Sequence, residues 1–229
     1  MNTLNTKSAR PLITDWCQID WQKINQYVEK LQQRIYHAES VGNKRKVRNL
    51  QRMLMNSEAA LLVSIRRVTQ LNHGKRTAGV DGYKALNPQD RLKLFTEMRD
   101  MKLSLHTPKP AYRTYIRKKN GKLRPLGIPT IRDRVYQNVV RLALEPQWEA
   151  RFEPTSYGFR PKRNCHDAIE RIFNTMKSNN NKKQWIFEGD FKGCFDTLSH
   201  EYILKQIQGF PEAELIMKWL RAGYVDNNV

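Results

Sequence analysis

KQWIFEGDFKGCFDTLSH, residues 183–200, is the stretch that decides the fold. Residues 185–187 form a short apolar run bounded by polar residues and a glycine. This pattern is typical of a buried strand, although a buried helical segment would share it. Asp190 closes the run, and Ser199 is placed to cap a following helix. A carboxylate at the end of a buried strand suits a hard cation such as Mg²⁺, which prefers oxygen ligands.

The neighbourhood of Asp190 carries more information than the aspartate alone, because a single short motif is a weak signal. The string DFKGCFD at 190–196, followed by LSH at 198–200, resembles motif A of reverse transcriptases in the form carried by group II intron-encoded proteins. Two more stretches agree in order: LRPLGIPT at 123–130 resembles the family's fingers hairpin, and SYGFRP at 156–161 its next block. The resemblance runs from about Trp21 to the C-terminus.

This resemblance implies an α+β fold, with an N-terminal helical region followed by reverse-transcriptase fingers and an incomplete palm. It implies that Asp190 and the backbone carbonyl of Phe191 hold Mg²⁺ in the complete enzyme, with Asp190 catalytic. It also implies that Phe195 shuts out a ribose 2′-OH and so favours dNTP over NTP. On the residues alone, Phe195 is equally explained as a core aromatic.

Residues 112–128 have the pattern of a β-hairpin. Two sets of side chains alternate before the turn: Tyr112, Thr114 and Ile116 on one face, and Arg113, Tyr115 and Arg117 on the other. Asn120-Gly121 follows, which is the strongest short hairpin turn signal. A basic hairpin can fold over a triphosphate and neutralise its charge. The resemblance assigns Lys118 and Arg124 to the phosphates of the incoming nucleotide, and Lys119 is an alternative to Lys118. The other interpretation is an edge hairpin whose charges protect it from aggregation.

The composition favours a polyanionic partner. The 229 residues carry a net charge of +19, and residues 61–135 hold 18 Lys and Arg against 5 Asp and Glu. Nucleic acid is the expected partner, while a generally basic protein or one bound to an acidic membrane surface are the alternatives. No apolar run approaches the ~20 residues of a membrane span, and no export signal is present. Three scattered cysteines fit a reducing compartment, so we expect a nucleic-acid-associated protein of the bacterial cytoplasm.

The N-terminal region should be helical. Asp20 can cap one helix, Gly42-Asn43 should break the chain, and one second helix should follow with apolar residues from Val47 to Val68 on a stripe. Its other face is basic and includes Arg45, Arg48 and Arg52. That face either contacts an RNA backbone or is merely solvated. In the family that this chain resembles, the region is linked to binding of intron RNA.

We divide the chain into a mobile N-terminus (1–15), a helical RNA-binding region (16–80), and fingers with a partial palm (81–229). Asn87-Pro88 should begin a helix, and another should run from Arg132 to about Trp148. By the resemblance, Arg134 and Arg160 contact an RNA template paired with a DNA primer.

The match stops at Val229, before the family's Tyr-x-Asp-Asp turn, whose acids complete the metal site. One carboxylate does not assemble a two-metal centre, so we expect this chain alone to be inactive as a polymerase. A missing palm and thumb segment, or a dimer partner, would then be needed. The alternatives are a non-catalytic RNA-binding remnant, or a fragment of a retron, diversity-generating or CRISPR-associated reverse transcriptase.

Overall fold

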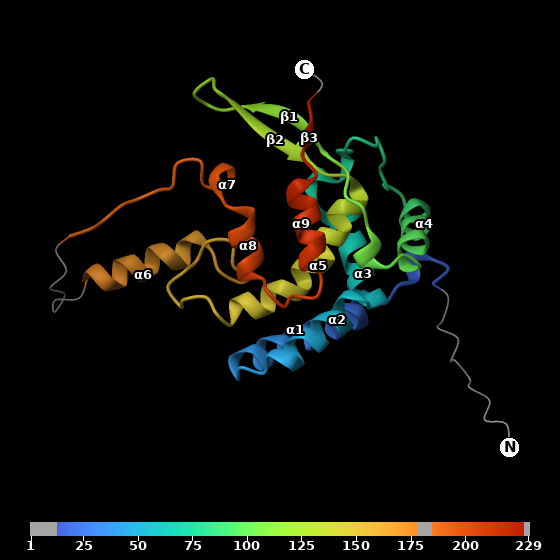
Figure 1. Ribbon diagram of the computed structural model, residues 1–229, viewed down its shortest axis with the longest axis horizontal. Coiled ribbons are helices and arrows are strands. Elements are labelled where there is room, and N and C mark those ends of the chain that lie inside the picture. Colours follow the sequence, from blue (N-terminus) through green and yellow to red (C-terminus); the bar gives the residue numbers. More distant parts are fainter. Residues whose placement is uncertain (1–12, 178–184, 227–229) are drawn as a thin grey trace.

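The structure is a computed structural model that describes residues 13–177 and 185–226, so most of the segment predicted to be mobile, 1–15, lies outside the described residues. Helices α1 to α5 form a body, and a β-hairpin and helix α6 project from it (Figure 1). The helices are α1 (Trp21–Ser40), α2 (Lys44–Met55), α3 (Glu58–Arg66), α4 (Pro88–Arg99), α5 (Ile131–Glu149), α6 (Cys165–Lys177), α7 (Cys194–Thr197), α8 (His200–Gln206) and α9 (Ala213–Arg221). The strands are β1 (Ala111–Arg117), β2 (Leu123–Ile128) and β3 (Tyr224–Val225), and short helical turns span Trp16–Gln18, Arg67–Leu71, His73–Arg76 and Leu103–Leu105.

Helix α5 is the centre of the hydrophobic core. Its apolar residues recur at helical spacing, and Ile131, Val135 and Ala143 are fully buried. Helices α1, α2 and α3 all contact α5, which runs through the middle of the body (Figure 1). The expected helix from Arg132 to Trp148 is thereby confirmed within one residue at each end.

The N-terminal helices begin where their capping residues predict. The Asp20 carboxylate accepts a hydrogen bond from the backbone N–H of Lys23, and Gly42 ends the first helix with a φ of +73°. The prediction of a single second helix is wrong, because the helix that begins at Lys44 ends at Met55. Ser57 restarts it by accepting a hydrogen bond from the backbone N–H of Ala60, and this local bond makes two helices, α2 and α3.

The predicted hairpin is confirmed. Strands β1 and β2 pair antiparallel with Tyr112 opposite Ile128, and Gly121 takes a φ of +79° in the turn. Strand β3 lies on the other side of β1 and pairs with it in parallel, which gives the order β2-β1-β3. Helix α9 leads directly into β3, so the last described residues are tied to the root of the hairpin (Figure 1).

The buried strand expected at residues 185–187 is wrong, as is the buried helical alternative. These residues have no regular secondary structure, and the side chains of Trp185 and Phe187 are 94% and 95% exposed. A strand needs a neighbour for its backbone hydrogen bonds and an apolar layer for its side chains. Figure 1 shows the stretch before α7 running outside the body with no described segment along it. Tyr202 of α8 is also exposed.

Candidate nucleic-acid interface

The predicted metal-binding residues lie together on the open loop before α7. One carboxylate oxygen of Asp190 accepts a hydrogen bond from the backbone N–H of Phe191 at 2.9 Å. Gly193, with a φ of +62°, turns the chain into the helix that carries Phe195. Both phenylalanine side chains are exposed, so the structure does not bury Phe195 as a core aromatic.

We tested whether this loop fits a divalent cation. Its donors are one exposed carboxylate and the neighbouring backbone carbonyl, and no group of three or more His, Cys, Asp or Glu side chains is placed for metal binding in residues 13–177 and 185–226. Mg²⁺ uses one or two carboxylates plus substrate phosphates, and a two-metal centre needs further carboxylates. The described residues therefore do not form a metal centre by themselves.

Lys118 and Arg124 are both exposed on the hairpin. The backbone N–H of Lys118 donates to the carbonyl of Lys122 at 2.8 Å, which places Lys118 beside the turn. Arg124 lies on β2 opposite Ile116. Within the described residues, neither of these cations forms an ion pair with Asp190.

Arg134 and Arg160, predicted to contact the template, have intramolecular partners instead. The Arg134 guanidinium donates to three backbone carbonyls, those of Pro129, Gly74 and Thr77. Arg160 is buried and makes two parallel bonds to the Glu149 carboxylate, at 2.6 and 2.9 Å. These bonds fix the loops before α5 and after it.

The predicted basic face of α2 is present at the surface. Arg45, Arg48 and Arg52 are all exposed, and none of them has an ion-pair partner among the described residues. Lys44, at the start of the same helix, is different because it pairs with the buried carboxylate of Glu39 at 3.1 Å. Uncompensated cations on one helix face attract a polyanion and release its counterions on binding.

Glu39 is a structural carboxylate that the sequence did not reveal. Its oxygens accept hydrogen bonds from Lys44, from Arg151 at 2.6 Å and from Gln147. Burial alone would raise the pKa of Glu39, but the bonds from Arg151 and Lys44 outweigh burial and lower it. The sequence around Glu39 does not predict this burial and pairing, because its partner Arg151 is more than a hundred residues away in the chain.

A second buried carboxylate, Asp133, joins α5 to α9. Its oxygens lie 2.6 Å from Nε2 of His106, 2.6 Å from the Thr130 hydroxyl and 3.1 Å from the indole nitrogen of Trp219. Burial alone would raise the pKa of Asp133, and hydrogen bonds from His106, Thr130 and Trp219 reverse this and lower it. Both oxygens of the carboxylate accept hydrogen bonds from neighbouring groups of the chain, so we assign Asp133 a structural role.

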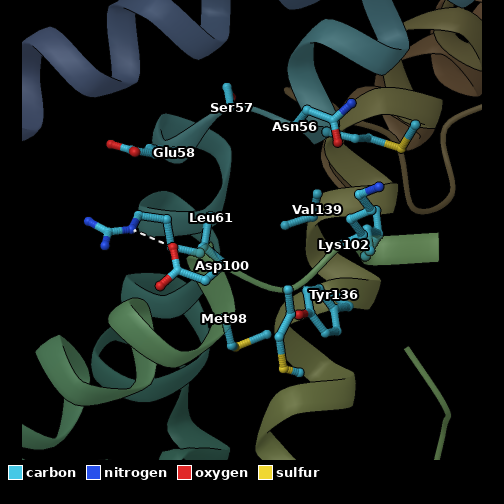
Figure 2. A pocket seen from close by; sticks show the side chains of 13 residues that line it. Asn56, Ser57, Glu58, Leu61, Met98, Asp100, Lys102, Tyr136 and Val139 are labelled. Carbon is cyan, nitrogen blue, oxygen red and sulfur yellow. Dashed lines mark hydrogen bonds and ion pairs between the residues drawn. The ribbon is translucent and has the colours of Figure 1, made fainter. Parts of the chain in front are cut away.

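A cavity of about 160 Å³ lies between α3, α4 and α5 (Figure 2). Its walls combine apolar side chains, such as Met98 and Val139, with the buried Tyr136 and with charged residues. Of these, Glu58 comes from α3 and Asp100 from the end of α4. The Tyr136 hydroxyl has no hydrogen-bond partner within the described residues. Asp190 does not line this cavity, which is therefore separate from the predicted polymerase site.

Two family models match successive parts of the chain. Residues 16–98 match the family described as the N-terminal domain of reverse transcriptase, and residues 116–228 match the reverse transcriptase (RNA-dependent DNA polymerase) family. The chain therefore belongs to the reverse transcriptases. Enzymes of this class generally use divalent metal ions.

Curated relatives place the chain among the group II intron-encoded proteins. It is similar to the group II intron-encoded protein LtrA of Lactococcus lactis subsp. cremoris, with 38% identity over 68% of this chain and 26% of that protein. Protein YkfC of Escherichia coli (strain K12) is 39% identical over 77% of this chain and 49% of its own length. Maturase-like protein 1 of Euglena gracilis is 30% identical over 82% and 41%. The chain thus spans half or less of these relatives, and no helix in its described part is long and apolar enough to cross a membrane.

Proposed function

We propose that this chain is the intron-RNA-binding portion of a group II intron reverse transcriptase and maturase. The observation that carries the proposal is the exposed basic face of α2, where Arg45, Arg48 and Arg52 form no ion pair within 4.0 Å among the described residues. In that part of the chain, the Glu212 carboxylate acts electrostatically on this face, through Arg52. The net charge of +19 supports it, because phosphate contacts dominate the affinity of proteins for nucleic acids. The relatives favour intron RNA over the RNAs of retron, diversity-generating or CRISPR-associated systems.

Template copying is the second part of the proposal and belongs to the complete protein. There, Lys118 and Arg124 would neutralise the phosphates of a dNTP, and Phe195 would lie against its sugar. Asp190 and the carbonyl of Phe191 would hold Mg²⁺ together with those phosphates. All five residues are exposed and so are accessible to a ligand, which supports this proposal.

We further propose that the 229-residue chain alone does not copy RNA. Asp190 is not gathered with other candidate metal ligands in the described part of the chain, and one carboxylate does not build a two-metal centre. Incorporation of dNTPs by the purified chain, on an RNA template with a DNA primer and Mg²⁺, would overturn this. The bacterial cytoplasm is the proposed location.

RNA binding can be tested with the group II intron RNA that encodes the Lactococcus lactis relative. Arg45→Glu/Arg48→Glu should weaken binding at least about tenfold, because each reversal removes a phosphate contact and adds repulsion. Lys84→Glu/Lys93→Glu is a matched control, since both lysines are exposed away from α2 and the charge change is identical. Equal losses in the two double variants would mean that only total charge matters and would refute the assignment of the face.

A further inference from the structure

Two adjoining surface hollows lie along α1 and α2, and together they are called the groove. Their volumes are about 370 and about 600 Å³, and they share Met53 as a common wall. One end of the groove is cationic, with Arg34 from α1 and Arg45 and Lys46 from α2. The other end is lined by Tyr27 and Ile24 from α1.

The lining of α1 is a single face of that helix. Residues 23, 27 and 34 are four and seven positions apart, so Lys23, Tyr27 and Arg34 project to the same side. At about 1.5 Å rise per residue, Tyr27 and Arg34 are about 10 Å apart along the axis. The Tyr27 ring and the Arg34 guanidinium therefore lie along the same side of the groove, one after the other in the direction of the helix axis.

Both ends of the groove remain available to a ligand. The side chains of Tyr27 and Met53 are 45% and 42% exposed. None of Arg34, Arg45 and Lys46 forms an ion pair among the described residues. A buried apolar peptide would leave these three charges desolvated, whereas a phosphate would neutralise them.

We propose that this groove binds an unpaired nucleotide of an RNA loop. The base stacks on Tyr27 and contacts Met53, and the flanking phosphates lie on Arg34, Arg45 and Lys46. Aromatic stacking with a cationic track is the usual way in which proteins hold single-stranded RNA. The Tyr27 end is lined by one cation, Lys23, and one anion, Glu58, whereas every charged residue at the opposite end is a cation, so the phosphates are placed there. The inference rests on the proposed function and adds to it the part of the RNA that is recognised.

The chain provides a close control for Tyr27. Tyr36 is on the same helix, nine residues further on and so on the opposite face, and its side chain is 46% exposed. Tyr27→Leu and Tyr36→Leu therefore remove the same ring from equally exposed positions. Tyr27→Phe keeps the ring and loses only the hydroxyl.

Binding to a ten-nucleotide oligoadenylate and to an RNA duplex of ten base pairs would be measured for all variants by fluorescence anisotropy. We expect Tyr27→Leu to weaken oligoadenylate binding by about 5- to 150-fold, the effect of losing one stacked base. Tyr27→Phe and Tyr36→Leu should bind it as the wild type does, and duplex binding should change in none. Arg34→Gln should lower the salt slope by about 0.7. Unchanged thermal unfolding temperatures would confirm that each variant folds.

Two outcomes would contradict the inference, and they are distinguishable. If Tyr27→Leu binds oligoadenylate like the wild type while Arg45→Glu/Arg48→Glu does not bind intron RNA, the groove proposal fails and the proposed function stands. If the wild-type chain binds neither oligoadenylate, duplex nor intron RNA, the proposed function fails and the groove proposal fails with it.

Discussion

Replacing Asp133 by alanine should be among the most destabilising single changes in this chain. The Asp133 side chain is 1% exposed, and its carboxylate accepts hydrogen bonds from side chains on three different segments. Alanine would leave the partly buried His106 ring and the partly buried indole N–H of Trp219 without this acceptor. The link between α5 and α9 would be lost, and with it the anchor of β3 on the hairpin.

The expected magnitude follows from what is left unpaired. Removing one partner of a buried, hydrogen-bonded pair costs about 3–5 kcal/mol, because the remaining group keeps its desolvation penalty. Domains of this size are stable by about 5–15 kcal/mol in total, so Asp133→Ala should remove a large share of the free energy of unfolding. At an m-value of about 2 kcal/mol per molar urea, the unfolding midpoint should fall by about 2 M.

Urea unfolding followed by tryptophan fluorescence would measure this, and Asp100→Ala is the control. The Asp100 carboxylate is 70% exposed and pairs only with its neighbour Arg99 among the described residues, so its loss should cost about 0–1 kcal/mol. A midpoint for Asp133→Ala within 0.5 M of the Asp100→Ala midpoint, a margin of about 1 kcal/mol at that m-value, would refute the reasoning. The buried cluster would then contribute no more than a surface ion pair.

Three other changes test the same structure. The folded-state pKa of Asp133 is lowered, so the stabilisation from this carboxylate is complete above the unfolded carboxyl pKa of about 3.9 and is lost as the pH falls below it. In Asp133→Asn, the free energy of unfolding measured with urea should therefore fall less steeply at acid pH. The same pH dependence in the variant and the wild type would contradict the pairing. Gly79→Ala should lower the free energy of unfolding by about 1–3 kcal/mol, because its methyl group would lie 2.7 Å from the Thr130 backbone. Gly158→Ala, with open space around it, should lower it by almost nothing. Equal thermal unfolding temperatures for the two variants would show that the backbone near Thr130 moves to accommodate the methyl group. Tyr136→Phe should leave stability unchanged or raise it by up to about 1 kcal/mol, since it removes a buried hydroxyl without a partner among the described residues, and a loss above 1 kcal/mol would reveal a partner.

Local signals in the sequence predicted the fold well. Asp20 begins α1, Asn87 begins α4 with proline after it, and Ser199 begins α8. Each of these side chains accepts a hydrogen bond from the backbone N–H three residues further on. The Asn120-Gly121 turn likewise fixed the hairpin register. Such features depend on a few neighbouring residues, which is why the sequence alone contains them.

Features that depend on distant residues could not be predicted. Residues 185–187 have the composition of a buried strand, yet burial requires neighbours that the composition does not specify, and here they are exposed. Arg160 belongs to a motif typical of the family, but its bidentate bond to Glu149 depends on how the loop after α5 folds back. The groove could not be predicted either, because Tyr27 and Arg34 of α1 line it only together with residues of α2.

The salt dependence of RNA binding tests the central claim most directly. The affinity of the wild-type chain and of Arg45→Gln/Arg48→Gln/Arg52→Gln for the intron RNA of the Lactococcus lactis relative would be measured between 50 and 200 mM salt. If the basic face of α2 contacts phosphates, the slope of log affinity against log salt should be shallower in the triple variant by about 2–3, at 0.7–0.9 for each lost contact. Identical slopes for the two proteins would contradict the account, because the arginines of α2 would then be solvated charges without a nucleic-acid partner.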